Sequence, residues 1–395
     1  MNKKRTNQSI SNNNENKSPN HGIIPKKQNI QQKHFNFTRQ QPTSINNLND
    51  KQLLSTSFYD FLNLENIGSG AFAQVYKGYE KLPSIAPLHK YREVALKRIN
   101  LAAITDPAIY KTTINEVKIF SSLDHKNIVK CYRSFEEISP FSQIRYLILV
   151  LEYINGGDLH LCIQDRAIKQ FCFFHEYEIW YLFEQISSAV YYIHSKKIMH
   201  RDLKPPNILL NNNYFVKLAD FGLSRLNLAI GGQAKTVCGT PYYMSPERIN
   251  EEPYTFASDI WSLGCILYEM AALKSPFFGE KENLSSLIQK IRSANFPPIA
   301  DRFSPQLEYL IESCMNPNME ERPTACEVFN AAQHMNNLWV KWLNEQKNEK
   351  NKNEENIIMT EKELLSSSPK VSTSSTNTFT QQIVCSELEN VQNNS

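Results

Sequence analysis

The sequence predicts an α+β fold with two lobes, a small β-rich lobe followed by a larger helical lobe, flanked by two disordered tails. Residues 58–152 hold the strand-like runs, residues 156–335 hold the long helical periods, and both ends of the chain are polar with only scattered apolar residues. Because strands come first and helices second, we expect two packed units with a cleft between them.

Composition sets the class of protein. Of 395 residues 41% are hydrophobic, which is enough for a sizeable core. The 43 basic and 40 acidic residues leave a net charge of +3, so we expect no nucleic-acid and no membrane partner. The eight cysteines form no CxxC pair and no apolar signal segment begins the chain, which favours reduced thiols and a cytoplasmic or nuclear protein.

Two terminal segments are predicted to be disordered. Residues 1–52 are rich in Asn and Gln, and residues 345–395 pass from Lys, Glu and Asn into Ser and Thr, so neither buries enough apolar surface to offset ordering entropy. Docking or phosphorylation is the functional alternative for these tails. The C-terminal tail shows no heptad repeat, so no coiled coil is predicted and the oligomeric state stays open.

Five strand-like runs and one helix make up the first lobe. "FLNLENI" and "AFAQVYKGY" flank a glycine turn, and "EVALKRIN", "KCYRSF" and "RYLILVLEY" follow, with a helix over about 107–123 between the third and fourth runs. In the second lobe the clearest helix spans 176–195, with one apolar stripe formed by Ile179, Leu182, Phe183, Ile186, Val190 and Ile193.

The glycine turn reads "IGSGAFAQV". Gly68 and Gly70 allow a backbone to approach a phosphate without an intervening side chain, although two glycines between strands are usually only a hairpin turn. Ala73 stands where a third glycine would complete the usual pattern, and no Walker motif occurs in the chain.

The run "VALK" places Lys97 on a strand. A strand lysine that faces a cleft can bind phosphate oxygens if a carboxylate holds it in place. Glu116, in the predicted helix, is the natural partner, and Glu93 and Glu80 are less well placed competitors.

Two further motifs decide the chemistry. "HRDLKPPNILL" puts a histidine, an arginine, an aspartate, a lysine and an amide into one proline-stiffened loop, and "LADFGLS" follows it with a second aspartate. Chance assembly of the glycine turn, VALK, HRDLKPxN and DFG in this order is negligible. The residues concerned are His200, Arg201, Asp202, Lys204, Asn207, Asp220, Phe221 and Gly222.

From Leu64 to about Met335 the sequence resembles a eukaryotic protein kinase domain, and Lys204 two residues after Asp202 is similar to the serine/threonine type. "CGTPYYMSPERI", "SDIWSLGCILYEMAALKSPFFGEKENL" and "FPPI" resemble the NIMA-related kinase family, its short members in particular. The resemblance implies a bilobal protein kinase fold and ATP-dependent transfer of the γ-phosphate to serine or threonine hydroxyls of protein substrates.

The resemblance also implies residue roles. Asp202 would orient the substrate hydroxyl and accept its proton, and Lys204 would neutralise charge on the phosphoryl group. Asp220 and Asn207 would bind Mg²⁺. Lys97, fixed by Glu116, would bind the α- and β-phosphates of ATP.

Other implied ATP contacts lie around the glycine turn and the strand that ends the first lobe. Leu151 falls at the gatekeeper position, and the backbone from Glu152 to Ile154 would bond adenine. Asp158 lies where a ribose contact is often found, but the N-cap of the next helix is an equally good interpretation. The implied set is Ile67, Gly68, Ser69, Gly70, Val75, Ala95, Lys97, Glu116, Leu151, Glu152, Ile154 and Asp158.

Several conspicuous residues fit structural roles better. Glu247 is predicted to pair with Arg322, Asp259 to anchor the backbone of the catalytic loop, and His200 to bond backbone rather than to carry protons.

Residues 220–247 correspond to an activation segment. Thr236 matches the site that relatives phosphorylate, by an upstream kinase or by autophosphorylation, and its phosphate could pair with Arg201. An unmodified loop threonine is the alternative. Thr240 is predicted to bond Asp202 and Lys204 beside the acceptor.

The sequence departs from the short family members in three places. The loop over 80–92 is longer, Phe221 stands where they carry leucine, and they lack a tail like 345–395. The main alternative function is a pseudokinase scaffold that binds nucleotide and partners without turnover, which the presence of Lys97, Asp202 and Asp220 disfavours. A small-molecule kinase is disfavoured by "GTPYYMSPE". Family resemblance alone suggests work in the cell cycle, on microtubules or in cilia, and a cytoskeletal or ciliary location.

Overall fold

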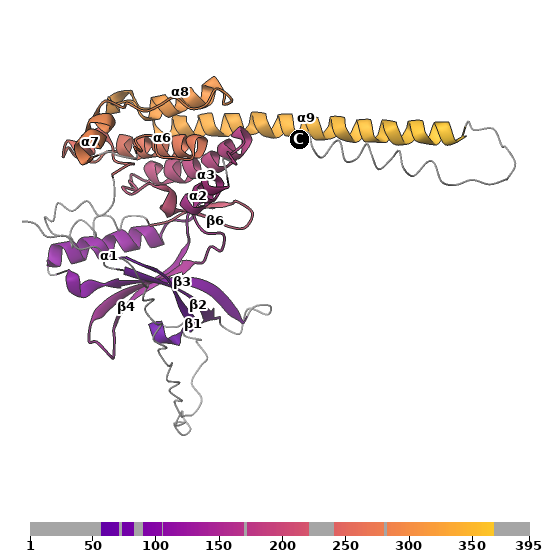
Figure 1. The fold of residues 1–395 in the computed structure, drawn as a ribbon. Helices are drawn as coiled ribbons and strands as arrows, with labels where there is room; N and C mark the ends of the chain where they lie inside the picture. The colour runs from indigo at the N-terminus through magenta and orange to yellow at the C-terminus, as the bar shows by residue number, and fades with distance from the viewer. Residues whose placement is uncertain are drawn as a thin grey trace, which may run out of the picture. The chain divides into compact units, whose positions relative to one another are not determined.

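The computed structural model describes residues 57–70, 73–82, 90–104, 106–169, 172–220, 241–279 and 283–366, which all belong to one unit of the chain, residues 52–395. The predicted α+β fold with a β-rich lobe followed by a helical lobe is confirmed. Figure 1 shows the sheet, the helix α1 beside it and the helical lobe beyond α1.

The first lobe is a five-stranded antiparallel sheet in the order β1-β2-β3-β5-β4. Its strands match the five predicted runs, and α1 lies between the third and fourth strands in sequence, as predicted. The elements are β1 (Leu62–Ser69), β2 (Ala73–Lys81), β3 (Tyr91–Asn100), α1 (Pro107–Ser121), β4 (Cys131–Ile138) and β5 (Arg145–Glu152).

The two faces of this sheet serve different cores. Alternate residues of β5 point to opposite faces, so Leu149 joins the core shared with α1 and the helical lobe, whereas Ile148 and Val150 face the other side. There they pack with Phe58, the first residue of the short helix η1 (Phe58–Asp60), and with Phe61, which directly follows it. The sheet is therefore covered on both faces, which holds β3 and β5 rigidly in place.

The helical lobe is built around α6 (Phe256–Ala272), which is buried along almost its whole length. A side chain at Gly264 would meet Met315 at 2.7 Å, so glycine allows close packing against the end of α8. The remaining elements are η2 (Leu101–Ala103), α2 (Leu159–Ile168), α3 (Glu176–Ser195), η3 (Pro205–Asn207), β6 (Ile208–Leu210), β7 (Val216–Leu218), α5 (Pro246–Ile249), α7 (Leu284–Arg292), α8 (Pro305–Cys314), η4 (Met319–Glu321) and α9 (Ala325–Ser366).

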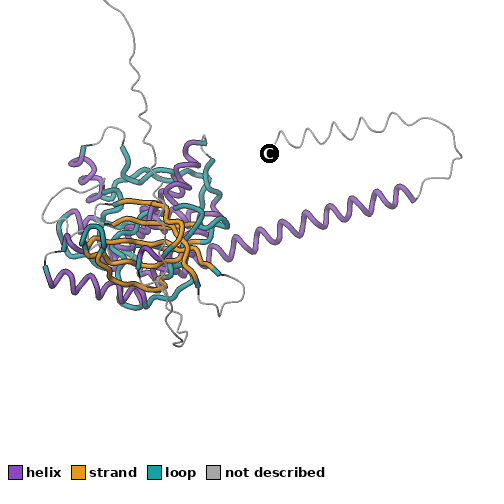
Figure 2. The backbone as a smooth tube through the Cα atoms, turned by 90° about the horizontal axis from the view of Figure 1, so that it is seen from below, coloured by secondary structure: helices purple, strands orange, loops and turns teal. Residues whose placement is uncertain are grey.

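Helix α9 differs from the sequence prediction. Its first part packs along α3, and it continues as helix to Ser366, beyond residue 345 where disorder was predicted (Figures 1 and 2). The polar stretch is rich in Glu and Lys, which have good helix propensity, and pairs such as Lys341 and Glu345 (4.0 Å) support it. The prediction of disorder from residue 345 rested on the polar composition of this stretch, which is also compatible with an exposed helix. The predictions for 1–52 and 367–395 fall outside the described residues.

Two negative findings concern only the described ranges. None of their helices has the length and apolar content needed to cross a membrane. Six cysteines lie in these ranges, and all six are free thiols.

Candidate functional site

The loop that carries the predicted catalytic residues is held in place by hydrogen bonds to Asp259, which lies near the start of α6. Its buried carboxylate accepts the backbone N–H groups of His200 (2.8 Å) and Arg201 (3.0 Å), and it also contacts His194 Nε2 at 2.8 Å and the hydroxyl of Tyr254. Burial acts to raise the pKa of Asp259, but the contact with His194 outweighs it and keeps the pKa low. The predicted anchoring role is confirmed.

His200 is a structural residue, as predicted. It is fully buried, its Nδ1 accepts the N–H of Asp202 at 3.3 Å, and its Nε2 therefore carries the hydrogen donated to the carbonyl of Ala219 at 3.0 Å. Burial lowers the pKa of the imidazole, so the ring is neutral at physiological pH.

Asp202 is held by two neighbours on the same loop. Asn207 Nδ2 donates to the backbone carbonyl of Asp202 at 2.7 Å and to its Oδ2 at 2.9 Å. Lys204 Nζ lies 3.0 Å from the same Oδ2. Both side-chain contacts use Oδ2, and among the described residues Oδ1 accepts no hydrogen bond.

Asn207 and Asp220 are linked through one backbone hydrogen bond. The N–H of Ala219 donates to the carbonyl of Asn207 at 2.9 Å, so the residue before Asp220 is tied to the end of η3. Asp220 has a φ of 63°, a left-handed conformation that is uncommon for a residue other than glycine. β7 ends at Leu218, two residues before this position.

Lys97 pairs with Asp220 and not with Glu116, which corrects the sequence prediction. Lys97 Nζ lies 2.6 Å from Asp220 Oδ1, whereas Glu116 Oε1 lies 3.9 Å from a guanidinium nitrogen of Arg201. The predicted pair joined two elements of the first lobe, and the observed pair instead joins β3 to the end of β7. Burial acts to raise the pKa of Asp220, but Lys97 lowers it below its usual range, so the carboxylate is charged.

The two competing partners considered for Lys97 have other roles. Glu93 accepts the hydroxyl of Tyr79 at 2.7 Å and lies 3.1 Å from Lys77. Glu80 is fully buried and pairs with two arginines, Arg92 and Arg133.

The two glycines of the predicted turn lie in loose surroundings among the described residues. Gly68 is paired with Val75 of β2, and the N–H of Gly70 donates to the carbonyl of Ala73 at 2.8 Å. An added Cβ would meet its nearest neighbour at 3.8 Å at Gly68 and 3.7 Å at Gly70, which are ordinary contacts. Packing within the described residues therefore does not explain either glycine. Ile67 and Ser69 lie on β1 between and beside them.

The end of β5 presents both a buried wall and a polar backbone. Ala95 of β3 is the register partner of the buried Leu151. The side chain of Glu152 accepts a hydrogen bond from Lys217 at 2.8 Å, which turns it toward β7. Within the described part of the chain, the backbone N–H and C=O of Ile154 form no hydrogen bond. The predicted adenine-binding backbone is thus unpaired at this residue.

Asp158 is the N-cap of α2. Its carboxylate accepts the N–H of Leu161 at 2.8 Å. The capping interpretation is confirmed, and the ribose contact stays a prediction.

Glu247 and Arg322 form the predicted ion pair, with two hydrogen bonds of 2.9 Å each. Burial acts to raise the pKa of Glu247, but the bonds from Arg322 and Ser258 lower it to about 2. Thr236, Thr240 and Phe221 lie outside the described residues.

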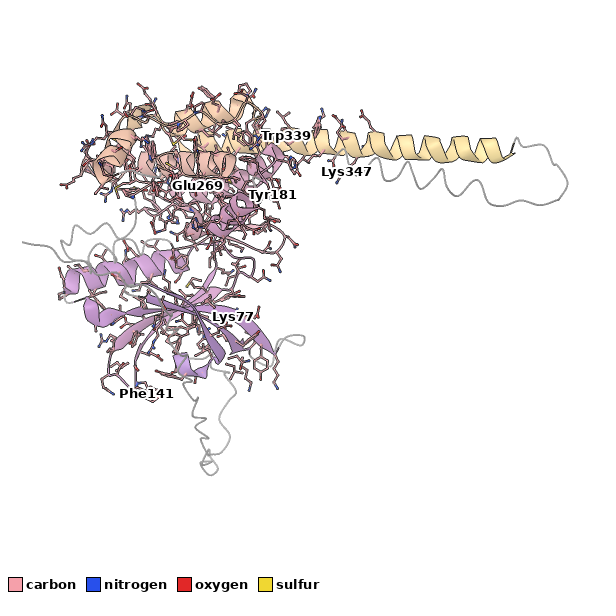
Figure 3. The ribbon with its side chains drawn as sticks, viewed as in Figure 1. Lys77, Phe141, Tyr181, Glu269, Trp339 and Lys347 are labelled. Carbon is pink, nitrogen blue, oxygen red and sulfur yellow. The ribbon has the colours of Figure 1, made fainter. Side chains whose placement is uncertain are left out.

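One buried acid was missed from the sequence. Glu269 of α6, labelled in Figure 3, accepts the hydroxyl of Tyr243 at 2.6 Å. Burial raises the pKa of Glu269 to about 7, against the opposite effect of this hydrogen bond. The signal was present, since a lone glutamate interrupts the otherwise apolar run "CILYEMAAL".

The described residues contain no group of three or more His, Cys, Asp or Glu side chains that could bind a metal ion. A site built from one carboxylate and one amide is smaller than such a group. Asn207 uses its Nδ2 in both side-chain hydrogen bonds, which leaves its amide oxygen for a hard cation, and Asp220 supplies the charged oxygen.

Comparison with known proteins gives a consistent result. The family described as "Protein kinase domain" matches residues 61–340. The chain is 38% identical over 269 residues to "Probable serine/threonine-protein kinase nek3" of Dictyostelium discoideum, covering 67% of this chain and 22% of the relative. It is 39% identical over 263 residues to "Serine/threonine-protein kinase Nek8" of Danio rerio, covering 66% and 35%. It is 37% identical over 283 residues to "Serine/threonine-protein kinase Nek5" of Homo sapiens, covering 71% and 37%. The chain thus spans well under half the length of these relatives.

Proposed function

Because the chain belongs to the protein kinase domain family and its kinase domain is similar to NIMA-related serine/threonine kinases, we propose that it transfers the γ-phosphate of ATP to serine or threonine hydroxyls of protein substrates. The observation that carries this proposal is the held carboxylate of Asp202, with Asn207 and Lys204 both on its Oδ2. Such a carboxylate offers its other oxygen as a positioned base.

The reaction uses this arrangement directly. The substrate hydroxyl donates to Oδ1 of Asp202, which receives the proton as the hydroxyl oxygen bonds to the γ-phosphorus of ATP. The bond between that phosphorus and the oxygen that bridges it to the β-phosphate breaks, and ADP leaves. A positioned base of this kind contributes about 10² to 10⁴-fold in rate. Lys204, whose ammonium lies 3.0 Å from Asp202, brings positive charge next to the transferring phosphoryl group.

The nucleotide is bound by groups of the first lobe. Lys97 attracts the α- and β-phosphates, and the backbone at Gly68 and Gly70 approaches them because no side chain intervenes. The unpaired backbone groups of Ile154 hydrogen-bond the adenine edge, with Leu151 as an apolar wall.

Mg²⁺ is the divalent cation that this donor set fits best. Asp220 and the amide oxygen of Asn207 are hard ligands that would hold it. The ion would supply positive charge that neutralises the phosphate oxygens of ATP. Asp220 would have to give up its ion pair with Lys97 in order to bind the ion, and Lys97 would then be available for the phosphates.

The competing function is a pseudokinase scaffold. Full-length protein should transfer radiolabelled phosphate from ATP to casein or to itself, and Asp202→Ala should reduce the rate by at least about 10²-fold. Asp165→Ala is the control, because Asp165 is an exposed partner of Lys169 on α2. Transfer that survives Asp202→Ala would rule out the assigned base. Nucleotide binding without turnover at any Mg²⁺ concentration would instead favour the scaffold.

Three finer proposals rest on family resemblance. We propose that Thr236 is phosphorylated, by an upstream kinase or by the chain itself. We propose that substrates carry a hydrophobic residue three positions before the acceptor, and that serine is preferred over threonine because Leu223 follows the DFG motif. A peptide-library screen tests the last two. We also propose a cytoplasmic, nuclear or cytoskeletal location, which imaging of a fluorescent fusion would test.

A further inference from the structure

The helical lobe carries an apolar groove that the phosphotransfer reaction does not use. It has a volume of about 310 Å³ and lies between the end of α2, the exposed side of α3, the β6–β7 turn and α9. Aromatic and aliphatic side chains dominate its lining, chiefly Phe174, Tyr177, Tyr181, Tyr214, Trp339 and Val340. Figure 3 labels Tyr181 on α3 and Trp339 on α9, which lie at the same end of the lobe.

The floor of the groove is buried and its walls are exposed. Phe174 is buried, whereas Tyr181 is 40%, Tyr214 49% and Val340 47% exposed. Single exposed apolar residues are normal on a protein surface, but exposed apolar residues that gather around a hollow mark a binding site.

The groove is preformed, because its walls are tied together. Asn336 of α9 donates its side-chain amide to Glu184 of α3, and the rings of Tyr177 and Trp339 lie 6.5 Å apart. Binding a segment there would therefore need little rearrangement of the lobe.

The course of α9 indicates which segment can occupy the groove. From Leu343, the last groove residue, the helix runs 23 residues to Ser366, or about 35 Å at the α-helical rise. About 11 extended residues cover the same distance in return. A chain that turns back directly after Ser366 therefore reaches the groove from about residue 377 onward.

The apolar residues of the tail gather just beyond this point, after a stretch in which Val371 is the one aliphatic side chain. Residues 366–378 are mainly serine, threonine and other polar residues, and Phe379, Ile383 and Val384 follow within "TFTQQIVC". This stretch carries no basic or acidic residue, which suits a groove whose lining is mostly apolar and whose two charged members, Arg166 and Glu178, pair with each other. We propose that the groove binds residues 379–384 of the same chain, so that the C-terminal tail folds back onto the helical lobe.

Crosslinking tests the location. A photoreactive benzoyl-phenylalanine replaces Phe379 in the full-length protein, and crosslinked peptides are identified by mass spectrometry. Intramolecular crosslinks to residues 174–182, 213–214 or 336–343 are expected. Val340→Glu should reduce them about tenfold, because it puts a charge into an apolar contact. Leu338→Glu is the matched control, since Leu338 is 49% exposed on the same helix but does not line the groove.

Three results of that experiment would overturn the proposal. These are crosslinks to other surfaces, equal loss in Val340→Glu and Leu338→Glu, and crosslinks that appear only in dimers, which would assign the groove to a second copy of the chain.

A peptide competition tests self-occupancy. A labelled peptide of residues 376–391 is titrated into full-length wild type and Ile383→Asp. A tethered tail has an effective concentration on the order of 1 mM, so a peptide with a Kd of about 0.1 mM should bind wild type about tenfold more weakly than Ile383→Asp. Equal affinity for both, or binding that Val340→Glu leaves unchanged, would contradict the proposal. Neither experiment measures kinase activity, so failure of the proposed function would not affect them.

Discussion

Lys97 and Asp220 form a direct ion pair, with 2.6 Å between Nζ and Oδ1, while Glu116 lies beside Arg201. The positive group assigned to the phosphates and the negative group assigned to the metal thus neutralise each other. Binding of a nucleotide and its metal between them requires the two side chains to separate. Glu116 is the carboxylate that the family resemblance assigns to Lys97 in that bound state.

Glu116→Gln should therefore reduce kcat/KM about 10- to 100-fold, the effect of losing one charge-assisted hydrogen bond. Glu93→Gln is the control, because Glu93 is occupied by Tyr79 and Lys77 on the outer part of the sheet. Steady-state kinetics with varied ATP separates the two. If both variants lose activity equally, Glu116 has no special relation to Lys97.

Asp259→Asn should loosen the catalytic loop. The two oxygens of Asp259 each accept one backbone N–H, whereas asparagine has a single side-chain oxygen. The N–H of His200 or of Arg201 therefore loses its acceptor in a fully buried site. The free energy of unfolding, measured with denaturant, should fall by about 1 to 3 kcal/mol. Tyr254→Phe keeps both backbone contacts and should have the smaller effect. The reverse order would exclude the anchoring role.

The pair of Glu247 and Arg322 should stabilise the protein only above acid pH. The pKa of Glu247 is about 2 when folded, against 4.5 for the free side chain, so this stability is complete above about pH 4.5 and is lost as the pH falls toward 2. Its size is about 3 kcal/mol. Glu247→Gln should remove this pH dependence and destabilise the protein at pH 7, because it leaves Arg322 buried without a countercharge. Denaturant titrations at several pH values would show whether the acid window persists in the variant.

Glu269 should have the opposite pH dependence. Its pKa is about 7 when folded, against 4.5 for the free side chain, so the folded state holds a proton that the unfolded state has released. Stability should therefore decrease from about pH 4.5 to pH 7, by about 3 kcal/mol. Glu269→Gln keeps a side-chain oxygen for Tyr243 and should remove this decrease. The difference between wild type and variant isolates the effect from other groups, and parallel curves would contradict it.

Thr236 and Thr240 should respond differently to alanine substitution. Thr236→Ala should lower activity by removing a phosphorylation site, and phosphopeptide mapping should show the loss. Thr240→Ala should impair catalysis even in protein phosphorylated at Thr236, because its hydroxyl is predicted to bond Asp202 and Lys204. An unchanged phosphopeptide map and an unchanged rate in Thr236→Ala would contradict the hypothesis that phosphorylation of Thr236 regulates activity.

Local sequence was sufficient for the elements and for most of the catalytic loop. The strand runs of the first lobe are short and rich in β-branched and aromatic residues, and α3 has a helical apolar period, so the local pattern predicts these elements. The contacts of Asp202 with Lys204 and Asn207 join residues within one loop, so they follow from the motif itself.

Contacts between distant segments needed the tertiary structure. The sequence assigned Lys97 to Glu116, but only the placement of β3 against the end of β7 puts Asp220 beside Lys97. The extent of α9 was also missed, because its polar half has no apolar pattern to read and its first half is held by packing on α3. The residue types and their order determined the family and the chemistry. Which charges meet, and which aromatic residues gather into a groove, depended on where the folded chain brings remote side chains together, and local propensity carries no information about that.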